Sequence, residues 1–447
     1  MIARVVWVSL LLGLASSEKG CALSGVHVTL GDHFTHRDSD ILYRVGVLTY
    51  NEDCVDRVDL LYEGGGRELS FKVSRQRRYE DSSLDYVRVF LFFELRGIPN
   101  GSDFRYSLRV DGVLTKGPFE FRSAVQSGQV KLAVFADHDL EKGQAVLAHL
   151  KEKTYDALLV LGDIAYDIQD RKGLVGDEYF EAIEPVVTTR PYIFVPGNHE
   201  NHDSSRMLNY RFVYPGCVDP MDNNLFAFRL GNLLFFAANF DHFLEIQADR
   251  YMPQLTGLQR LIEIYSKKFP DHARIFVSHR PIYRADLRDD KIESLSLIYR
   301  LKPFEELLIQ SGVKLYLFAH QHSYERYYSM HNYEMLKDRS DAIVIVGTGG
   351  NKENIEGYPY EQPFVREKIF KTDGVLALQN FEDRISLAFV EAISGKLRDP
   401  YDVLLDEGQR TKGRWVLTGL GILGISVAAI GAAFFYRRAN PAKAYRI

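Results

Sequence analysis

The strongest constraint on the fold comes from five apolar runs of strand length, each of which stops at polar side chains. The runs are KLAVFAD (131–137), DALLVLGD (156–163), YIFVPGNHE (192–200), RIFVSHRP (274–281) and KLYLFAHQH (314–322). Helix-like segments lie between several of them, such as LEKGQAVLAHLKEK (140–153) and FEELLIQSG (304–312). Buried runs that alternate with helices predict a mostly parallel sheet that is covered by helices on both faces.

In such folds, ligands bind beyond the carboxyl ends of the strands. The side chains at these ends are Asp137, then Asp163 and Tyr166, then Asn198 and His199, then His279, and finally His320 and His322. Any one of them alone is better explained as a cap or a satisfied polar core group. Together, crowded carboxylates and imidazoles are costly without a cation. Seven or more donors exceed the need of one tetrahedral ion and fit two metals that share a bridge.

The donor types also indicate which metals would bind. Tyr166 as a phenolate is a hard ligand suited to Fe(III), whereas asparagine and imidazole suit a divalent ion such as Zn, Fe or Mn. Two adjacent metals can neutralise an in-line phosphoryl transfer.

Five ordered blocks of this chain resemble the metal-binding blocks of the purple acid phosphatases, and the animal iron/zinc type is the most similar. The blocks are Asp137, GDIAY (162–166), GNHE (197–200), FVSH (276–279) and AHQHSYER (319–326). RPIY after His279, GDEYFEAIEPV (176–186), VGTGGNKE (346–353) and LRDPYDV (397–403) add to the likeness. The resemblance implies an αββα sandwich of the calcineurin-like metallophosphoesterase superfamily over residues 130–404.

The resemblance also implies a role for each residue. Asp137, Asp163, Tyr166 and His322 would hold Fe(III), and Asp163 would bridge to a divalent ion completed by Asn198, His279 and His320. His199 would face the substrate and either stabilise the phosphate or protonate the leaving alkoxide; the alternative is a histidine that only orients Asn198. The implied enzyme is an acid phosphatase in which hydroxide held at the Fe(III)–M(II) centre attacks a phosphomonoester.

Two departures from the family pattern are visible in the sequence. The first block reads Asp137-His138-Asp139 where the family usually has Asp-x-Gly, so Asp139 adds a charge near a metal ligand. After His279 the chain offers Arg280 and Arg284 but no nearby histidine. Arginine can bind phosphate bidentately, but an ordinary solvated surface charge is an equally good interpretation of either residue.

Residues 18–123 read as a separate all-β domain. Short alternating segments such as ILYRVGVLTY (41–50) and YVRVFLFFEL (86–95) are separated by turn residues, which is typical of a β-sandwich. The segment is similar to the fibronectin-III-like N-terminal domain of the same family. Cys21 with Cys54 is a candidate disulfide, although the third cysteine, Cys217, leaves the pairing open.

The two ends of the chain predict a membrane protein of single-pass type I. Residues 1–17 have the pattern of a signal peptide. Residues 415–436 contain no charge and are long enough to span a bilayer, which leaves a cytosolic tail at 437–447. The body would then lie outside the cell or in a secretory or lysosome-like lumen, with Asn100 in a glycosylation sequon. Small residues in the span leave a homodimer open.

Two other functions stay open at this point. A nucleotide pyrophosphatase or phosphodiesterase could use the same metal site, because pocket loops choose the substrate. A non-catalytic cell-surface binding protein could keep the fold as a scaffold, but all seven ligand positions carry suitable residues. The net charge of −5 gives no electrostatic reason to expect a nucleic-acid partner.

Overall fold

A computed structural model describes most of the chain between residues 20 and 405. The described residues are 20–30, 40–81, 84, 86–99, 101–123, 128–152, 154–201, 206–214, 223–241, 251–285, 292–336, 341–351 and 362–405. The predicted signal peptide (1–17), membrane span (415–436), cytosolic tail (437–447), glycosylation sequon at Asn100 and Cys217 lie outside these ranges. Among the helices of the described ranges, none is long and apolar enough to cross a membrane.

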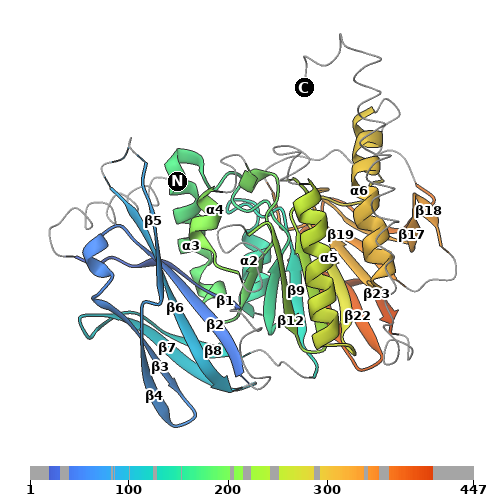
Figure 1. Cartoon of the computed structure of the whole chain (residues 1–447). Coiled ribbons are helices and arrows are strands. Elements are labelled where there is room, and N and C mark those ends of the chain that lie inside the picture. Colours follow the sequence, from blue (N-terminus) through green and yellow to red (C-terminus); the bar gives the residue numbers. More distant parts are fainter. Residues whose placement is uncertain are drawn as a thin grey trace.

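The N-terminal part is a sandwich of two four-stranded antiparallel sheets (Figure 1). One sheet has the order β1 (Ser24–Leu30), β2 (Asp40–Thr49), β6 (Arg88–Pro99) and β5 (Arg75–Tyr79). The other has the order β4 (Arg67–Lys72), β3 (Val58–Gly64), β7 (Asp103–Val110) and β8 (Val113–Arg122). The predicted β-sandwich is therefore present, and its fibronectin-III-like identity stays a prediction.

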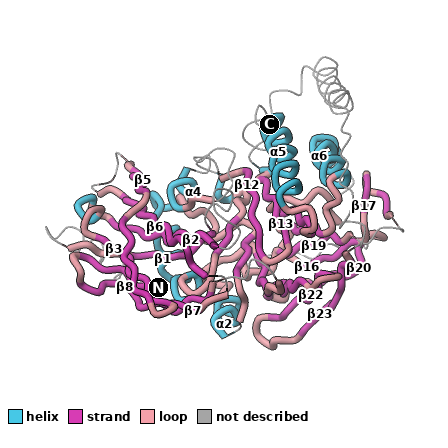
Figure 2. Tube along the Cα trace, turned by 60° about the horizontal axis from the view of Figure 1, so that its bottom comes forward, coloured by secondary structure: helices cyan, strands magenta, loops and turns pink. Residues whose placement is uncertain are grey.

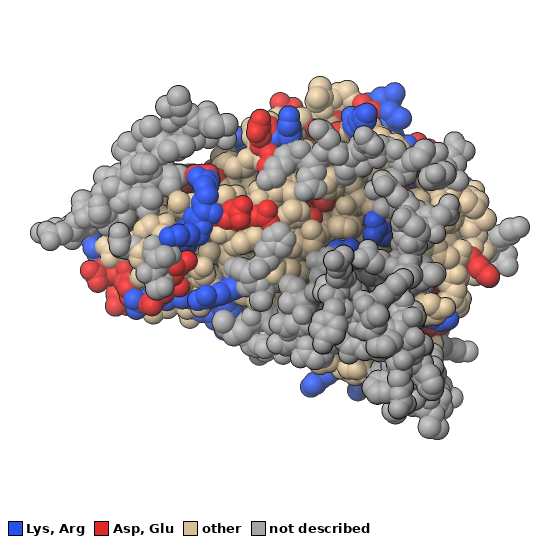
Figure 3. All heavy atoms as spheres, turned by 90° about the horizontal axis from the view of Figure 1, so that it is seen from above, with Lys and Arg blue, Asp and Glu red and all other residues tan. Residues whose placement is uncertain are grey.

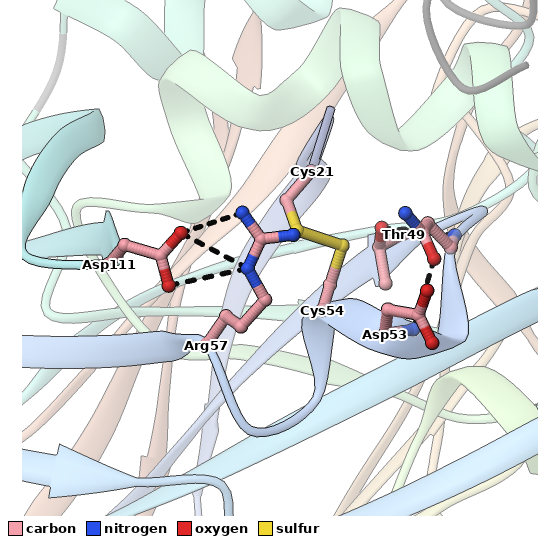
Figure 4. Close-up of a disulfide and its surroundings, with 7 residues drawn as sticks. Cys21, Thr49, Asp53, Cys54, Arg57 and Asp111 are labelled. Carbon is pink, nitrogen blue, oxygen red and sulfur yellow. Dashed lines mark hydrogen bonds and ion pairs between the residues drawn. A yellow bond between two sulfur atoms is a disulfide. The ribbon is translucent and has the colours of Figure 1, made fainter. Parts of the chain in front are cut away.

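A disulfide joins Cys21, just before β1, to Cys54 in the short helix η1 (Glu52–Cys54), which confirms the candidate pair (Figure 4). Nearby, Arg57 donates to Asp111, with Nη2 at 2.6 Å from Oδ2, and so connects the start of β3 to the β7–β8 turn. The disulfide therefore fixes the segment before β1 to the connection between β2 and β3.

The second part contains two mixed sheets stacked face to face. The first has the order β11 (Tyr192–Phe194), β10 (Ala157–Val160), β9 (Lys131–Phe135), β21 (Gly374–Asn380), β22 (Arg384–Glu391) and β23 (Leu397–Leu404). The second has the order β12 (Leu225–Leu230), β13 (Leu233–Ala238), β14 (Ala273–Val277), β15 (Leu315–Phe318), β19 (Ala342–Val346), β16 (Tyr324–Tyr327) and β20 (Val365–Ile369). A small ribbon, β17 (Met330–His331) with β18 (Glu334–Met335), lies beside them.

Helices cover the outer faces of both sheets. Helix α2 (Gln144–Glu152) packs against β21 and against α3 (Leu174–Val187). Helices α5 (Tyr251–Lys268) and α6 (Ile292–Gln310) cover the seven-stranded sheet (Figure 2). Leu258 and Phe304 of these helices share a core with Phe276 of the sheet. The chain is therefore an α/β structure with two central sheets. The two-sheet αββα arrangement that the resemblance implied is confirmed. The expectation of one mostly parallel sheet, drawn from the apolar runs, is wrong, because the parallel strands are divided between two sheets and antiparallel strands extend each.

A buried ionic cluster fastens the N-terminal sandwich to this α/β part. Asp177 on α3 accepts a hydrogen bond from Arg88 Nε on β6 at 2.7 Å and another from Tyr50 Oη at 2.8 Å. Arg211 from helix α4 (Arg206–Arg211) donates to the other oxygen of Asp177. The side chains of Arg88, Asp177 and Arg211 are at most 3% exposed. The two parts thus share one charged interface with two arginines and one aspartate.

His27 on β1 lies in the same interface and makes the stability of the folded chain depend on pH. The ring stands 5.5 Å from Phe180 and 5.2 Å from Phe212, and its Nδ1 is 2.9 Å from Gly25 O. Burial, helped by the positive charge of Arg211, lowers the pKa of His27 from 6.5 to about 4. Below pH 6.5 the unfolded chain takes up a proton that the folded chain accepts only near pH 4. Stability is therefore fully present above pH 6.5 and falls as the pH drops through this window.

We expect His27→Gln to abolish the uptake of one proton on unfolding between pH 6.5 and 4. The slope of the unfolding free energy against pH should therefore fall by up to about 1.4 kcal/mol per pH unit. Denaturant unfolding of the full chain at several pH values measures it. Thr29→Val is the matched control, since it changes another buried side chain on the same face of β1 without removing a titrating group. A His27→Gln protein with the wild-type slope would contradict the assignment.

On the face shown in Figure 3, described acidic and basic side chains are interspersed and do not gather into one basic area. This part of the surface gives no electrostatic reason for binding a polyanion.

Candidate active site

The polar side chains that follow the parallel strands converge between the two sheets. Strands β9, β10 and β11 run parallel in one sheet, and β13, β14, β15 and β19 run parallel in the other. All seven predicted ligand residues follow β9, β10, β11, β14 or β15 and lie close to one another in two groups.

The first group consists of Asp137, Tyr166 and His322. The Nε2 atom of His322 lies 3.1 Å from Asp137 Oδ1 and 3.1 Å from Tyr166 Oη. All three side chains are largely buried. A carboxylate oxygen, a phenol oxygen and an imidazole nitrogen therefore face one common point.

The second group consists of Asp163, Asn198, His279 and His320. His279 Nε2 lies 3.0 Å from Asp163 Oδ2 and 3.2 Å from Asn198 Oδ1. Asp163, His279 and His320 each offer a ligand atom, and these atoms lie within 4.8 Å of one another. The Nδ1 atom of His279 is 2.6 Å from the carbonyl oxygen of Leu161, which accepts its proton and leaves Nε2 free to face the group.

The electrostatics of the second group favour a cation. Burial lowers the pKa of His279, but the charge and hydrogen bond of Asp163 outweigh it and raise the pKa to about 10. Burial raises the pKa of Asp163, but the two histidines His279 and His199 lower it to about 2. The carboxylate thus demands a positive partner, and a metal ion bound to His279 would replace the proton.

An unpartnered buried oxygen tests whether the first group fits a metal. Asp137 Oδ1 is buried and, although His322 Nε2 lies 3.1 Å away, it makes no hydrogen bond within the part of the chain that the structure describes. A buried carboxylate oxygen without a donor is costly. Since the Tyr166 and His322 atoms point to the same place, a cation there would satisfy all three. The donor sets therefore fit two adjacent ions.

Glu200 supports the loops that carry these ligands. Its Oε2 accepts from Asp163 N at 3.0 Å and from Gly197 N at 2.8 Å, and its Oε1 accepts from Ile164 N at 3.0 Å. Burial, then the charge of Asp163, raise the pKa of Glu200 to about 7. Glu200 therefore holds the β10 and β11 loops together and is not a ligand in this arrangement.

Backbone constraints explain the glycines and the unusual conformations of these loops. A Cβ on Gly197 would lie 2.2 Å from Asp163 Oδ1, and one on Gly162 would lie 2.7 Å from His279 Nδ1. Ala165, Tyr166 and Asp167 are consecutive residues with positive φ. Such strain persists only where the surroundings fix it, and it clusters at functional sites.

His199 begins the short helix η3 (His199–Asn201) and contacts the first group edge-on. Its ring centroid is 4.7 Å from that of Tyr166, its Nδ1 is 3.0 Å from Asp167 Oδ1, and its Nε2 is 4.0 Å from Asp163 Oδ2. Burial lowers the pKa of His199, but Asp163 and Asp167 outweigh it and raise the pKa. Asp167 was not among the predicted site residues, although it directly follows Tyr166.

The residues after His322 tie strands together. Glu325 is fully buried, accepts from Tyr327 Oη at 2.6 Å and lies 3.1 Å from Lys368 Nζ on β20. Arg326 forms a bidentate pair with Asp399 on β23, both contacts at 2.6 Å. These contacts join β16 to β20 in its own sheet and to β23 in the other sheet.

Asp139, whose charge was expected to lie near a metal ligand, accepts hydrogen bonds from the following turn. Its Oδ1 accepts from Glu141 N at 2.7 Å and Lys142 N at 3.3 Å, so the carboxylate caps the turn before α2. The neighbouring His138 is buried, with Nδ1 3.0 Å from Tyr179 Oη. The departure from Asp-x-Gly therefore serves the local turn.

The polar residues that follow a sixth strand, β13, were not predicted to contribute to the site. Asn239 donates to Asn201 Oδ1 at 3.0 Å and to Asn224 Oδ1 at 2.6 Å, which anchors η3. Asp241 is fully buried and accepts from Arg280 Nε. The only signal was an apolar run, LLFFAA (233–238), followed by Asn and Asp, which are also common turn residues.

Comparison with known proteins agrees with this geometry. Residues 131–324 match the family model described as calcineurin-like phosphoesterase. Acid phosphatase type 7 of Homo sapiens is 31% identical over 263 residues, 53% of this chain and 59% of the relative. Purple acid phosphatase 22 of Arabidopsis thaliana is 25% identical over 259 residues, 54% of this chain and 55% of the relative. The chain spans somewhat more than half the length of these curated relatives.

The overall architecture also has a solved counterpart. The structure of purple acid phosphatase PPD1 from yellow lupin (Lupinus luteus) seeds superposes with a TM-score of 0.69 at 14% sequence identity, and covers 87% of this chain and 75% of that one. At this identity the likeness concerns the fold alone.

Proposed function

Since residues 131–324 are a calcineurin-like phosphoesterase domain, we propose that this chain is an acid phosphatase that hydrolyses phosphomonoesters. The observation that carries the proposal is that Asp163 and Tyr166, three residues apart after β10, belong to two different donor groups. Asp163 Oδ2 lies 3.0 Å from His279 Nε2, and Tyr166 Oη lies 3.1 Å from His322 Nε2. The relatives acid phosphatase type 7 and purple acid phosphatase 22 are both named as acid phosphatases, which supports the proposal.

The proposed ligand sets follow the two groups. Asp137, Tyr166, His322 and Asp163 would hold Fe(III), and Asp163, Asn198, His279 and His320 would hold a divalent ion such as Zn, Fe or Mn. When bound, the two ions supply charge neutralisation for the phosphoryl group and activate water near neutral pH. The protein residues fix the separation and orientation of the donors, because each follows the end of a strand.

His199 is the proposed proton donor to the leaving alkoxide. The Asp167 carboxylate holds the proton on Nδ1, so that Nε2 is directed towards the Asp163 side of the site at 4.0 Å. The raised pKa keeps the ring protonated at acidic pH, and proton donation is lost as the pH rises through that pKa. Activity should therefore be greatest at acidic pH.

The cellular setting belongs to the same proposal. Residues 1–17 and 415–436 suggest a single-pass type I anchor with the phosphatase part in a lumen or outside the cell. The Cys21–Cys54 disulfide supports an oxidising compartment. A homodimer through the span is a further proposal that rests on small residues in the sequence alone.

The activity is tested with the purified full chain in detergent. A chromogenic phosphomonoester should be hydrolysed at acidic pH, more efficiently than a chromogenic diester. Stripping the metals with a chelator should remove the activity, and adding iron with zinc should restore it. A preference for the diester would favour a phosphodiesterase, and no turnover by the metal-loaded chain would favour a binding protein.

A further inference from the structure

We propose that Arg280, held in place by the buried Asp241, binds a non-bridging oxygen of the substrate phosphate and selects phosphomonoester dianions over diesters. This deepens the proposed function and rests on it for the identity of the substrate.

The position of Arg280 places it at the edge where the ligand residues gather. It directly follows His279, beyond the end of β14. Strand β13 pairs in parallel with β14, with Ala237 opposite Val277, so Asp241 emerges from the same sheet edge three residues after β13 ends. The Nε atom of Arg280 donates to Asp241 Oδ1, so the pair joins the segment after β14 to the segment after β13.

The burial of this pair excludes a solvated surface charge. The side chain of Arg280 is 12% exposed, and that of Asp241 is fully buried. Burying a guanidinium and a carboxylate costs desolvation energy that a hydrophobic pair would avoid. A buried charged pair beside a candidate metal site is therefore better explained by the recognition of a charged ligand.

The chemistry of the pair suits a phosphate dianion. A guanidinium has five N–H groups in a fixed fork, so it can hold a carboxylate through Nε and bind phosphate oxygens through its terminal nitrogens. With Asp241 the pair is net neutral, which limits its repulsion of metal cations. A phosphomonoester dianion has one more negative charge and one more free oxygen than a diester, so it gains more from Arg280.

The test compares Arg280→Gln with Arg274→Gln in the metal-loaded full chain. Arg274 lies at the other end of β14, where its Nε donates to Ser266 Oγ and its Nη1 donates to Ser311 O, both at 2.9 Å. We expect Arg280→Gln to weaken the calorimetric Kd for inorganic phosphate roughly 10- to 100-fold and to raise KM for a phosphomonoester by a similar factor. KM for a diester should change less than about threefold, and Arg274→Gln should leave all three values unchanged.

Two further variants separate position from charge. Arg280→Lys keeps the charge but loses the fork and should lose part of the phosphate affinity. Asp241→Asn should also weaken phosphate binding, because the guanidinium is no longer held. Phosphate binding by Arg280→Gln equal to that of Arg274→Gln would overturn the inference, even if the chain is a phosphatase. Arg280-dependent phosphate binding without any monoester turnover would instead overturn the proposed phosphatase and leave the binding residue in place.

Discussion

Replacing Asp163 by asparagine is expected to lower kcat/KM for a phosphomonoester by about a thousandfold or more. Asp163 is the residue shared by both proposed ligand sets, and its buried carboxylate lies 3.0 Å from His279 Nε2. Asparagine has almost the same shape but no negative charge, so the loss falls on metal binding. A loss of several kcal/mol of transition-state stabilisation corresponds to this factor. Steady-state kinetics and metal analysis of the variant measure it.

The matched control is Asp156→Asn, at the opposite end of β10. Its Oδ2 accepts from Lys131 N at 2.7 Å, far along the strand from the site. This variant should keep its metals and its activity. An Asp163→Asn protein that retains both metals and full turnover would show that the carboxylate does not bridge the two sets.

Replacing Asp177 by asparagine is expected to destabilise the chain by about 3–5 kcal/mol. The change leaves the buried guanidiniums of Arg88 and Arg211 without a counter-charge, since both donate to this carboxylate. The interface between the N-terminal sandwich and the α/β part should open first. Denaturant unfolding measures the free energy, and limited proteolysis near the interface reports where the chain opens.

Glu178→Gln provides the matched control for Asp177. Glu178 is the next residue on α3 and pairs with Arg171 near the surface, where the side chains are 28% and 51% exposed. Pairs of this kind contribute about 1 kcal/mol or less. Equal unfolding free energies for the two variants would contradict a stabilising role for the buried cluster.

The sequence predicts the candidate site better than the fold around it. Metal ligands need particular side-chain types, and the carboxyl ends of buried strands bring such types together. At Asp137, Asp163, His279 and His320 the sequence shows both a buried apolar run and a ligand side chain directly after it. Asp167 and Asp241 were missed because a single acidic residue after a strand has many ordinary uses, and only the geometry reveals their partners His199 and Arg280.

Two strands of the N-terminal sandwich were not predicted, for a different reason. Strands β4 and β5 were not expected, since RELSFK and RQRRY are largely exposed and charged, although each pairs with a strand next to it in sequence, β4 with β3 and β5 with β6. The apolar runs alone did not show that the parallel strands divide between two sheets; only the family resemblance implied it. Periodicity identifies which residues are buried, but it does not identify the sheet to which a fully buried strand belongs.

The metal content of the purified full chain tests the central claim most directly. The two proposed ligand sets, which share Asp163, predict two metal ions per chain, one iron and one divalent ion, in protein prepared without added chelator. One ion per chain would contradict the shared-bridge arrangement. No bound metal after loading with iron and zinc would contradict the metal centre itself.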